Sequence, residues 1–427
     1  MTQGRHHSQS HTAPRWVAPT EEKTEEETMP IFDQGYQHWK GTLSGHVWRW
    51  LAITKQGLRG QFKSPIIRIL LLLAWLPALA LVTALGLWGL FEQKSEWVMQ
   101  LVKPILPPGV AADPHAYRLA IWTIAYSTFF KFETFFIMLL MVIAGPNLIS
   151  RDLRFNALPL YFSRPLRRLD YFLGKLGVIA ALVAAVAVAP AVVAYVFGIC
   201  FSLDLGMIRD TWRLLPAVIV YGLVIVASTG TLMLALSSLS RRSLYVGIAW
   251  GGLWVISSAV AGVLGGIQQQ ALYHGFWQEE MAHANPNSPR PDRPPDPDQP
   301  PPRRDPRSQA DWQRVRERVE QAQAKAAPTN WRPLCSYTAN LQRLGEALLD
   351  TDAAWVEIGR AMKMPQNAFQ QFLGSLRAAP APATERRMAD RMVPQYPWIW
   401  SAGVLASLLG ISLWTLSVRV KSLDRLR

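Results

Sequence analysis

The chain has 427 residues, of which 50% are hydrophobic and only 17% are charged, whereas about a quarter of the residues in an average soluble domain are charged. Lys and Arg outnumber Asp and Glu by 44 to 30, so the net charge is +14. Six stretches contain no charged residue, namely 69–91, 134–150, 176–203, 214–240, 243–278 and 392–418. Most of them exceed the roughly 20 residues that a helix needs to cross a bilayer, which excludes an ordinary soluble domain and predicts a multi-spanning membrane protein.

The first 66 residues divide into two segments. Residues 1–45 are polar, include an acidic run at 21–27 and contain too few apolar side chains to fold, so a disordered tail is predicted. In residues 46–66, Trp48 and Trp50 are mixed with basic side chains such as Lys55 and Arg59. This mixture suits the membrane interface, and we expect an interfacial elbow helix there, with part of an ordinary polar loop as the alternative.

Residues 67–267 are predicted to hold spans one to five, at about 67–91, 119–150, 173–199, 214–238 and 244–267, and residues 396–427 hold span six and a basic tail. The expected fold class is therefore all-α. Lys131 and Glu133 interrupt span two. Since an ionisable residue inside a membrane is a functional candidate by default, both are candidates for a transport pathway. Alternatively, residues 132–149 do most of the spanning and both side chains lie at the interface.

Residues 268–395 form a polar block between spans five and six. Ten prolines lie within 286–306 and predict a linker, while the charge and apolar spacing at 311–325 and 352–364 predicts helices. We therefore expect a small helical insertion. The two cysteines, Cys200 and Cys335, are too few for a disulfide framework, and whether they pair is left open.

Basic residues are concentrated in four segments: the approach to span one, the loop after span two, the loop after span four and the C-terminal tail. The two short loops on the other face, at 92–118 and 204–213, carry balanced charge. With six spans, all four basic segments lie on one face, and the positive-inside rule places that face and both termini in the cytoplasm. The 268–395 insertion is then extracytoplasmic. The basic excess thus indicates topology and not a nucleic-acid partner.

No phosphate-binding Gly-x-x-x-x-Gly-Lys-Ser/Thr sequence occurs in the chain, and neither His-Glu-x-x-His nor Gly-x-Ser-x-Gly is present. We therefore predict no catalytic residue, no metal site and no cofactor bound by this chain. A membrane-embedded enzyme has little support.

The loop after span two carries the most informative pattern. The span runs into a charged turn at Arg151-Asp152, a short amphipathic stretch follows, then Ser163-Arg164-Pro165, and Gly174-Lys175 opens span three. This order resembles the permease subunits of the bacterial ABC-2 family of ABC transporters, and the resemblance covers 47–267 and 397–427. The sequence departs from the usual pattern of that family in three places. Asp152 stands where glutamate is common, Asn156-Ala157 stands where Gly-Thr is frequent, and the insertion between spans five and six is unusually long.

The resemblance implies a coupling helix that contacts a separate cytoplasmic ATPase subunit, which would hold ATP and Mg, and a second identical or homologous permease. The implied ATPase-facing residues are Arg151, Asp152, Arg154, Asn156, Ala157, Leu158 and Tyr161, while Arg164, Pro165 and Lys175 would fix the return of the chain. The alternative for this loop is an ordinary positive-inside loop.

The expected function is that of a permease subunit of an ATP-driven transporter, an exporter in the bacterial inner membrane. A membrane anchor or assembly protein that acts through the 268–395 insertion is the alternative. The sequence does not specify a substrate.

Overall fold

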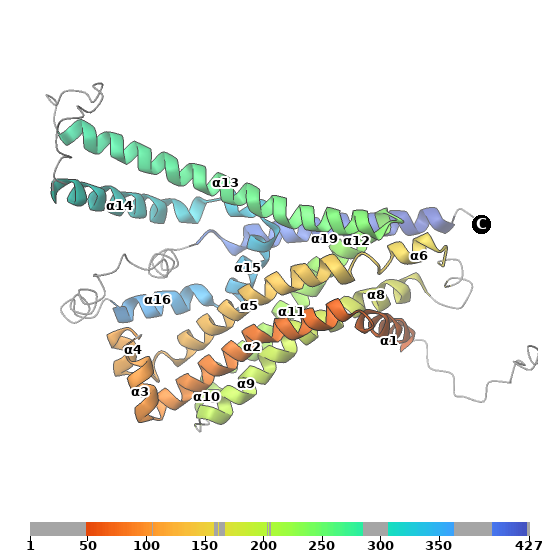
Figure 1. Ribbon diagram of the computed structural model, residues 1–427, viewed down its shortest axis with the longest axis horizontal. Coiled ribbons are helices and arrows are strands. Elements are labelled where there is room, and N and C mark those ends of the chain that lie inside the picture. Colours follow the sequence, from red (N-terminus) through yellow and green to blue (C-terminus); the bar gives the residue numbers. More distant parts are fainter. Residues whose placement is uncertain are drawn as a thin grey trace, which may run out of the picture. The chain divides into compact units, whose positions relative to one another are not determined.

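The computed structural model describes residues 48–104, 106–157, 161, 167–202, 204, 206–284, 306–362 and 395–424, and every regular element within these ranges is a helix (Figure 1). Six of the helices are long and apolar enough to cross a membrane. The fold therefore agrees with the all-α class with six candidate spans that the sequence predicts.

The spans are numbered in chain order. Span one is α2 (Pro65–Glu92) and span two is α5 (Arg118–Ala144). Span three consists of α8 (Arg168–Val183), η2 (Ala184–Val188) and α9 (Ala189–Ser202). Span four consists of α10 (Gly206–Thr211), α11 (Leu214–Ile225), η3 (Val226–Gly230) and α12 (Thr231–Leu239). Span five is α13 (Ser243–Ala284) and span six is α19 (Trp398–Asp424).

Spans one to four pack against one another through large apolar side chains. Trp122 of span two is fully buried and meets Tyr195 of span three edge-on at 5.7 Å between ring centroids. The Oη of Tyr126 donates a hydrogen bond to the carbonyl oxygen of Ala191 in span three. In contrast, only 11% of the apolar part of span five and 22% of that of span six is buried, against 61% in span four. Most of the surface of spans five and six is thus left for lipid or another protein.

The short helix α1 (Arg49–Phe62) packs along α8 at the start of span three. Gly174 and Gly177 allow this close approach, because a side chain at either would collide with Ile53 or Thr54. The Thr54 hydroxyl donates to the carbonyl oxygen of Gly174, and Gln61 donates to that of Ala144 at the end of span two. The helix predicted within 46–66 therefore exists and is fixed to two spans.

Spans three and four each contain one π-helical segment, η2 and η3. A π segment inserts one residue into an α-helix and is frequent at functional sites. In span four it carries Ser228 and Thr229, which are both buried.

The segment between spans five and six returns into the bundle. Its first helix, α14 (Pro306–Ala326), lies beside the far half of α13, and the short η5 (Arg332–Cys335) leads into α15 (Tyr337–Leu348) and α16 (Thr351–Met362) (Figure 1). α15 contacts spans two, four, five and six, and α16 packs on span two and on α4 (Pro108–Ala112). Tyr337 bonds to Thr229, which lies ten residues or about 15 Å from the end of span four. The sequence predicts a helical insertion here, but it does not predict that the insertion packs between the spans as far in as Thr229.

Two further details differ from the sequence prediction. Span two ends at Ala144, with a turn over 145–149 instead of helix. Span five continues to Ala284, well beyond the predicted end at 267, so that part of the polar block belongs to the same helix. Cys200 and Cys335 are both free and exposed.

Candidate functional site

The predicted coupling loop begins at α6 (Ser150–Arg154), a single helical turn that follows span two. The first N–H groups of a helix have no partner within it. Here the buried Ser237 of span four supplies one, since its Oγ accepts from Ile149 N at 3.1 Å and Ser150 N at 3.0 Å. The same hydroxyl donates to the carbonyl oxygen of Pro146 at 2.9 Å. The start of the loop is therefore fixed to span four.

Asp152 ties the loop to span three. Its carboxylate accepts a hydrogen bond from the Oη of Tyr171 at 2.8 Å and lies 2.7 Å from the Nζ of Lys175. The Lys175 ammonium also lies 5.4 Å from the centre of the Tyr171 ring, within cation–π range. The Asp152 carboxylate is thus engaged inside the chain, and its side chain is 15% exposed.

A left-handed residue ends α6. Asn156 has φ 49°, and the amides of Asn156 and Ala157 donate to the carbonyl oxygens of Leu153 and Asp152 at 3.4 and 2.9 Å. This is the Schellman arrangement, in which glycine or asparagine holds the left-handed position. The departure noted in the sequence, asparagine where glycine is frequent, therefore preserves the one conformation that the turn requires.

The other predicted loop residues fall into three groups. Arg151, Arg154 and Asn156 are exposed. Tyr161 packs on Tyr171, with ring centroids 5.5 Å apart, and its pKa is raised by burial and by the nearby negative charge of Asp152. Leu158, Arg164 and Pro165 lie outside the described residues.

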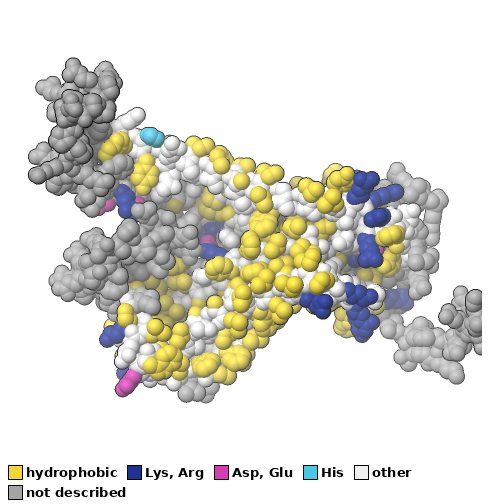
Figure 2. Space-filling view, in the orientation of Figure 1, with side chains coloured by type: hydrophobic (Ala, Val, Ile, Leu, Met, Phe, Trp, Pro, Cys, Tyr) yellow, Lys and Arg dark blue, Asp and Glu magenta, His cyan; other side chains and the backbone are white. Residues whose placement is uncertain are grey.

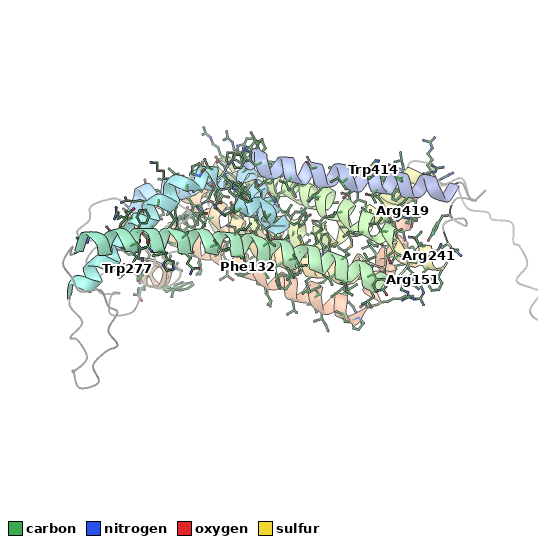
Figure 3. The ribbon with its side chains drawn as sticks, turned by 90° about the horizontal axis from the view of Figure 1, so that it is seen from above. Phe132, Arg151, Arg241, Trp277, Trp414 and Arg419 are labelled. Atoms are coloured by element: carbon green, nitrogen blue, oxygen red, sulfur yellow. The ribbon has the colours of Figure 1, made fainter. Side chains whose placement is uncertain are left out.

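The basic segments gather at one end of the bundle, which we call the basic end. Figure 3 places Arg151, Arg241 and Arg419 together there, and Trp277 of α13 at the opposite end. In Figure 2 the dark blue Lys and Arg side chains gather where Figure 1 shows α1, α6 and α8. Two loops and the end of span six, which are far apart in the sequence, thus form one positively charged surface.

Lys131 and Glu133 have different environments. The Nζ of Lys131 lies 2.6 Å from a carboxylate oxygen of Glu346 in α15, beside a small pocket lined by Ser127, Tyr221 and Gln342 among others. Lys131 lies 13 residues, or about 20 Å, along span two from Arg118, which places it at the middle of the helix. Glu133 is completely buried, and neither of its carboxylate oxygens has a hydrogen-bond partner. The structure does not bring the two side chains together.

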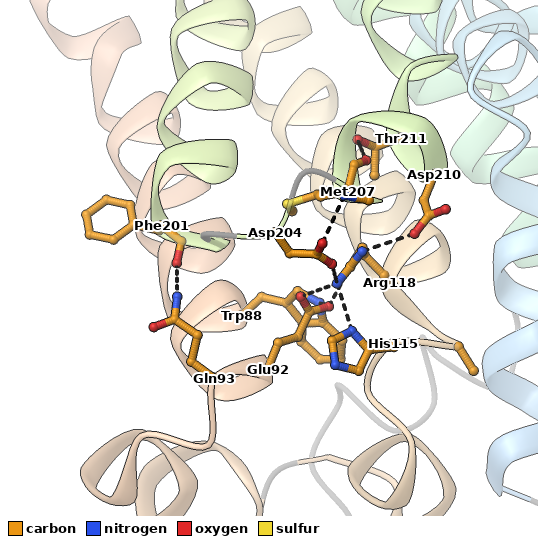
Figure 4. Close-up of polar contacts among 12 residues, drawn as sticks. Trp88, Glu92, Gln93, His115, Arg118, Phe201, Asp204, Met207, Asp210 and Thr211 are labelled. Atoms are coloured by element: carbon orange, nitrogen blue, oxygen red, sulfur yellow. Dashed lines mark hydrogen bonds and ion pairs between the residues drawn. The ribbon is translucent and has the colours of Figure 1, made fainter.

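A charge cluster that the sequence does not predict lies at the opposite end of the bundle (Figure 4). The guanidinium of Arg118, 2% exposed, contacts Glu92 at 2.8 Å, Asp204 at 2.9 Å and Asp210 at 3.0 Å. It also lies 2.7 Å from Nδ1 of His115, which therefore accepts. These residues join the adjacent ends of spans one and two to the connection between spans three and four and to α10 at the start of span four.

The pKa of the Asp204 carboxyl is lowered, first by the Gly206 amide that donates to it and then by Arg118. Balanced charge in the two connecting loops was the sequence signal for this cluster, but it does not say which charges meet. Among the described residues no group of three or more His, Cys, Asp or Glu side chains is placed to hold a metal ion.

Residues 111–290, which include spans two to five and the loop with α6, match the family model described as ABC-2 family transporter protein. The match supports an ABC-2 type permease over this segment, which is less than half of the chain. Together with the six candidate spans, it supports a multi-pass membrane protein of the ABC transporter class. Searches of curated proteins and of solved structures found no match.

Proposed function

We propose that the permease works with a separate cytoplasmic ATPase subunit, that α6 and the residues after it contact this subunit, and that the transport is export. The observation that carries the proposal is the construction of α6. It is one rigid turn, bonded to span four by Ser237 and to span three by Asp152. A push on such a turn reaches three spans at once, which is what a nucleotide-driven transporter needs at this position.

The charge distribution supports the same arrangement. Arg151 and Arg154 are exposed at the basic end, and no ion pair is formed by either within the described ranges. Positive side chains near the membrane favour the cytoplasmic face, and they would attract an acidic surface on a partner. We therefore propose a bacterial inner-membrane location with both termini in the cytoplasm and α1 at the membrane interface.

Spans five and six support the proposal of a second permease copy or a homologous permease. Their apolar surfaces are the least buried of the six spans. We also propose Lys131 and Glu133 as residues of the transport pathway, since Lys131 pairs with the returning helix α15 and Glu133 is a buried acid in span two. An ionisable side chain inside a membrane costs free energy, and such residues usually have a functional role.

The test is co-purification of the full chain with ATP-binding subunits from its native membrane. Arg154→Glu should weaken the association about tenfold or more, because it reverses an exposed charge that we assign to the interface. Arg209→Glu is the matched control, since Arg209 is exposed on α10 near the opposite end. Equal association of both variants with the ATPase would contradict the assigned loop.

The alternative, an anchor or assembly protein that acts through the inserted segment, has a different signature. Deletion of the inserted helices would then abolish function while Arg154→Glu had no effect. We favour the permease because residues 111–290 match the transporter family and cover the loop.

A further inference from the structure

Ser237 is a single side chain that serves three backbone groups, and none of them belongs to its own helix. It accepts from Ile149 N and Ser150 N and donates to the oxygen of Pro146, and it is fully buried. A buried polar group that loses its partner is costly. Any displacement of α6 must therefore either carry α12 with it or break these three hydrogen bonds.

The helix that carries Ser237 leads directly to the π segment of span four. Thr229 lies eight residues from Ser237, or about 12 Å along the helix. Its hydroxyl lies 2.9 Å from the Oη of Tyr337, and the Oγ of Ser228 lies 3.3 Å from the same atom. The π segment, where span four departs from α-helical geometry, is thus the place where span four holds the first residue of α15.

α15 is bonded to the spans along its whole length. The Oη of Tyr221 donates to the carbonyl oxygen of Leu341 at 3.1 Å, and Gly345 packs directly on the Tyr221 ring. The next residue, Glu346, pairs with Lys131 of span two. A movement of span four along its axis therefore acts on α15 at both Tyr337 and Leu341.

We propose that Ser237 is a positioning residue that carries the displacement of α6 along span four to α15, with Tyr337 as the receiving contact. This rests on the proposed function, in which an ATPase moves α6. It adds that the moving element in the middle of the bundle is the inserted helix α15, so that the insertion takes part in transport. Coupling between distant sites is carried by such contiguous hydrogen-bonded contacts on rigid helices.

Hydrogen exchange of the full-length chain in detergent tests the link without any ATPase. In Ser237→Ala we expect the amides of α15 to exchange about fivefold faster or more, the low end of ordinary coupling between sites. Ser238→Ala is the matched control, because the only partner of the Ser238 hydroxyl among the described residues is Ala235 of its own helix. It should leave α15 at the wild-type rate.

Two outcomes of that measurement overturn the proposal. One is faster exchange in α6 alone, with α15 unchanged. The other is an equal increase in spans one and two, which would make Ser237 a general stability residue.

The reverse experiment guards against a Ser237 variant that does not fold. Tyr337→Phe keeps the ring and removes only the hydroxyl that reaches Ser228 and Thr229. Because coupling is reciprocal, the amides of α6 should exchange faster by a similar factor. Unchanged exchange in α6 would overturn the link.

The ATPase subunit then separates this proposal from the one on which it rests. In the wild type, ATP should change the exchange of α15. Ser237→Ala should still co-purify with the ATPase, but ATP should no longer change the exchange of α15 in this variant. If the wild type binds no ATPase while the two exchange effects persist, the proposed function fails and the internal link stands. If the ATPase binds and ATP changes α15 equally in Ser237→Ala and wild type, the link fails and the proposed function stands.

Discussion

The two ends of the bundle use arginine in opposite ways. At the basic end Arg151 and Arg154 point outward, exposed and without an ion pair in the described part of the chain, while the bonds that hold the loop come from Ser237 and Asp152. At the opposite end Arg118 is buried and surrounded by three carboxylates. One end leaves its charges available to a partner, whereas the other uses its charges to join four spans. A mutation should therefore affect binding at the first end and stability at the second.

The largest effect is expected at Arg118. Replacing it by methionine leaves the Glu92 carboxylate buried and unpaired, which should lower the free energy of unfolding by about 3–5 kcal/mol. Thermal or denaturant unfolding in detergent measures the loss. Arg209→Met, on an exposed side chain, should change stability by no more than about 0.5 kcal/mol.

A double variant sharpens this result. Arg118→Met combined with Glu92→Leu removes both members of the buried pair and should recover much of the stability, because no buried unpaired charge remains and Asp204 and Asp210 are about half exposed. No recovery would mean that Asp204 and Asp210 are the partners that matter.

A smaller effect is expected for the ion pair at the basic end. Asp152 and Lys175 are 15% and 12% exposed, so a double-mutant cycle with Asp152→Asn and Lys175→Met should give a coupling energy of about 1–2 kcal/mol. Unfolding measurements on the four proteins supply the cycle. A coupling energy near zero would show that Tyr171 alone holds the carboxylate.

The turn after α6 depends on the left-handed conformation of Asn156. Asn156→Val forces a branched side chain into the left-handed region and should lower stability by about 1–2 kcal/mol. Asn156→Gly, the matched control, should be neutral or slightly stabilising. Equal losses in both variants would point to the asparagine side chain itself and not to the backbone conformation.

The smallest effect is the pH dependence of the charge cluster. The pKa of Asp204 is lowered in the folded chain, so its stabilising contribution is present above its unfolded pKa of about 3.9 and is lost as the pH falls through the lower folded pKa. The difference in unfolding temperature between wild type and Asp204→Asn should be constant from pH 5 to 7 and should narrow below about pH 4. A constant difference down to pH 3 would argue against this assignment.

Much of the fold follows from the sequence because hydropathy is a local property. The six uncharged stretches overlap the six candidate spans. The loop that the sequence pattern around Asp152 singles out lies within the segment that the family model matches. The helix around Trp50 is likewise visible in its mixture of side chains.

The remaining features depend on residues far apart in the chain. Lys131 pairs with Glu346, which lies 215 positions later in the chain, so the sequence does not reveal the pair. In the sequence, Ser237 is a small polar residue in an apolar helix, and nothing there indicates that its hydroxyl bonds to Pro146. The return of α15 is hidden for the same reason, since its polar partners are distant in the chain. They include hydroxyl groups of spans four and five, Lys131 of span two and the carbonyl oxygen of Tyr396 just before span six.

The length of α13 has a mechanical consequence. Its 42 residues extend about 63 Å, roughly twice the thickness of the hydrocarbon layer. About half of the helix therefore projects into water as a stiff rod, braced by α14 through the ion pair of Arg318 with Glu279. When the lipid-embedded half of α13 tilts, the projecting half tilts with it, and the far end of the helix is displaced laterally. The position of that end therefore follows the tilt of span five.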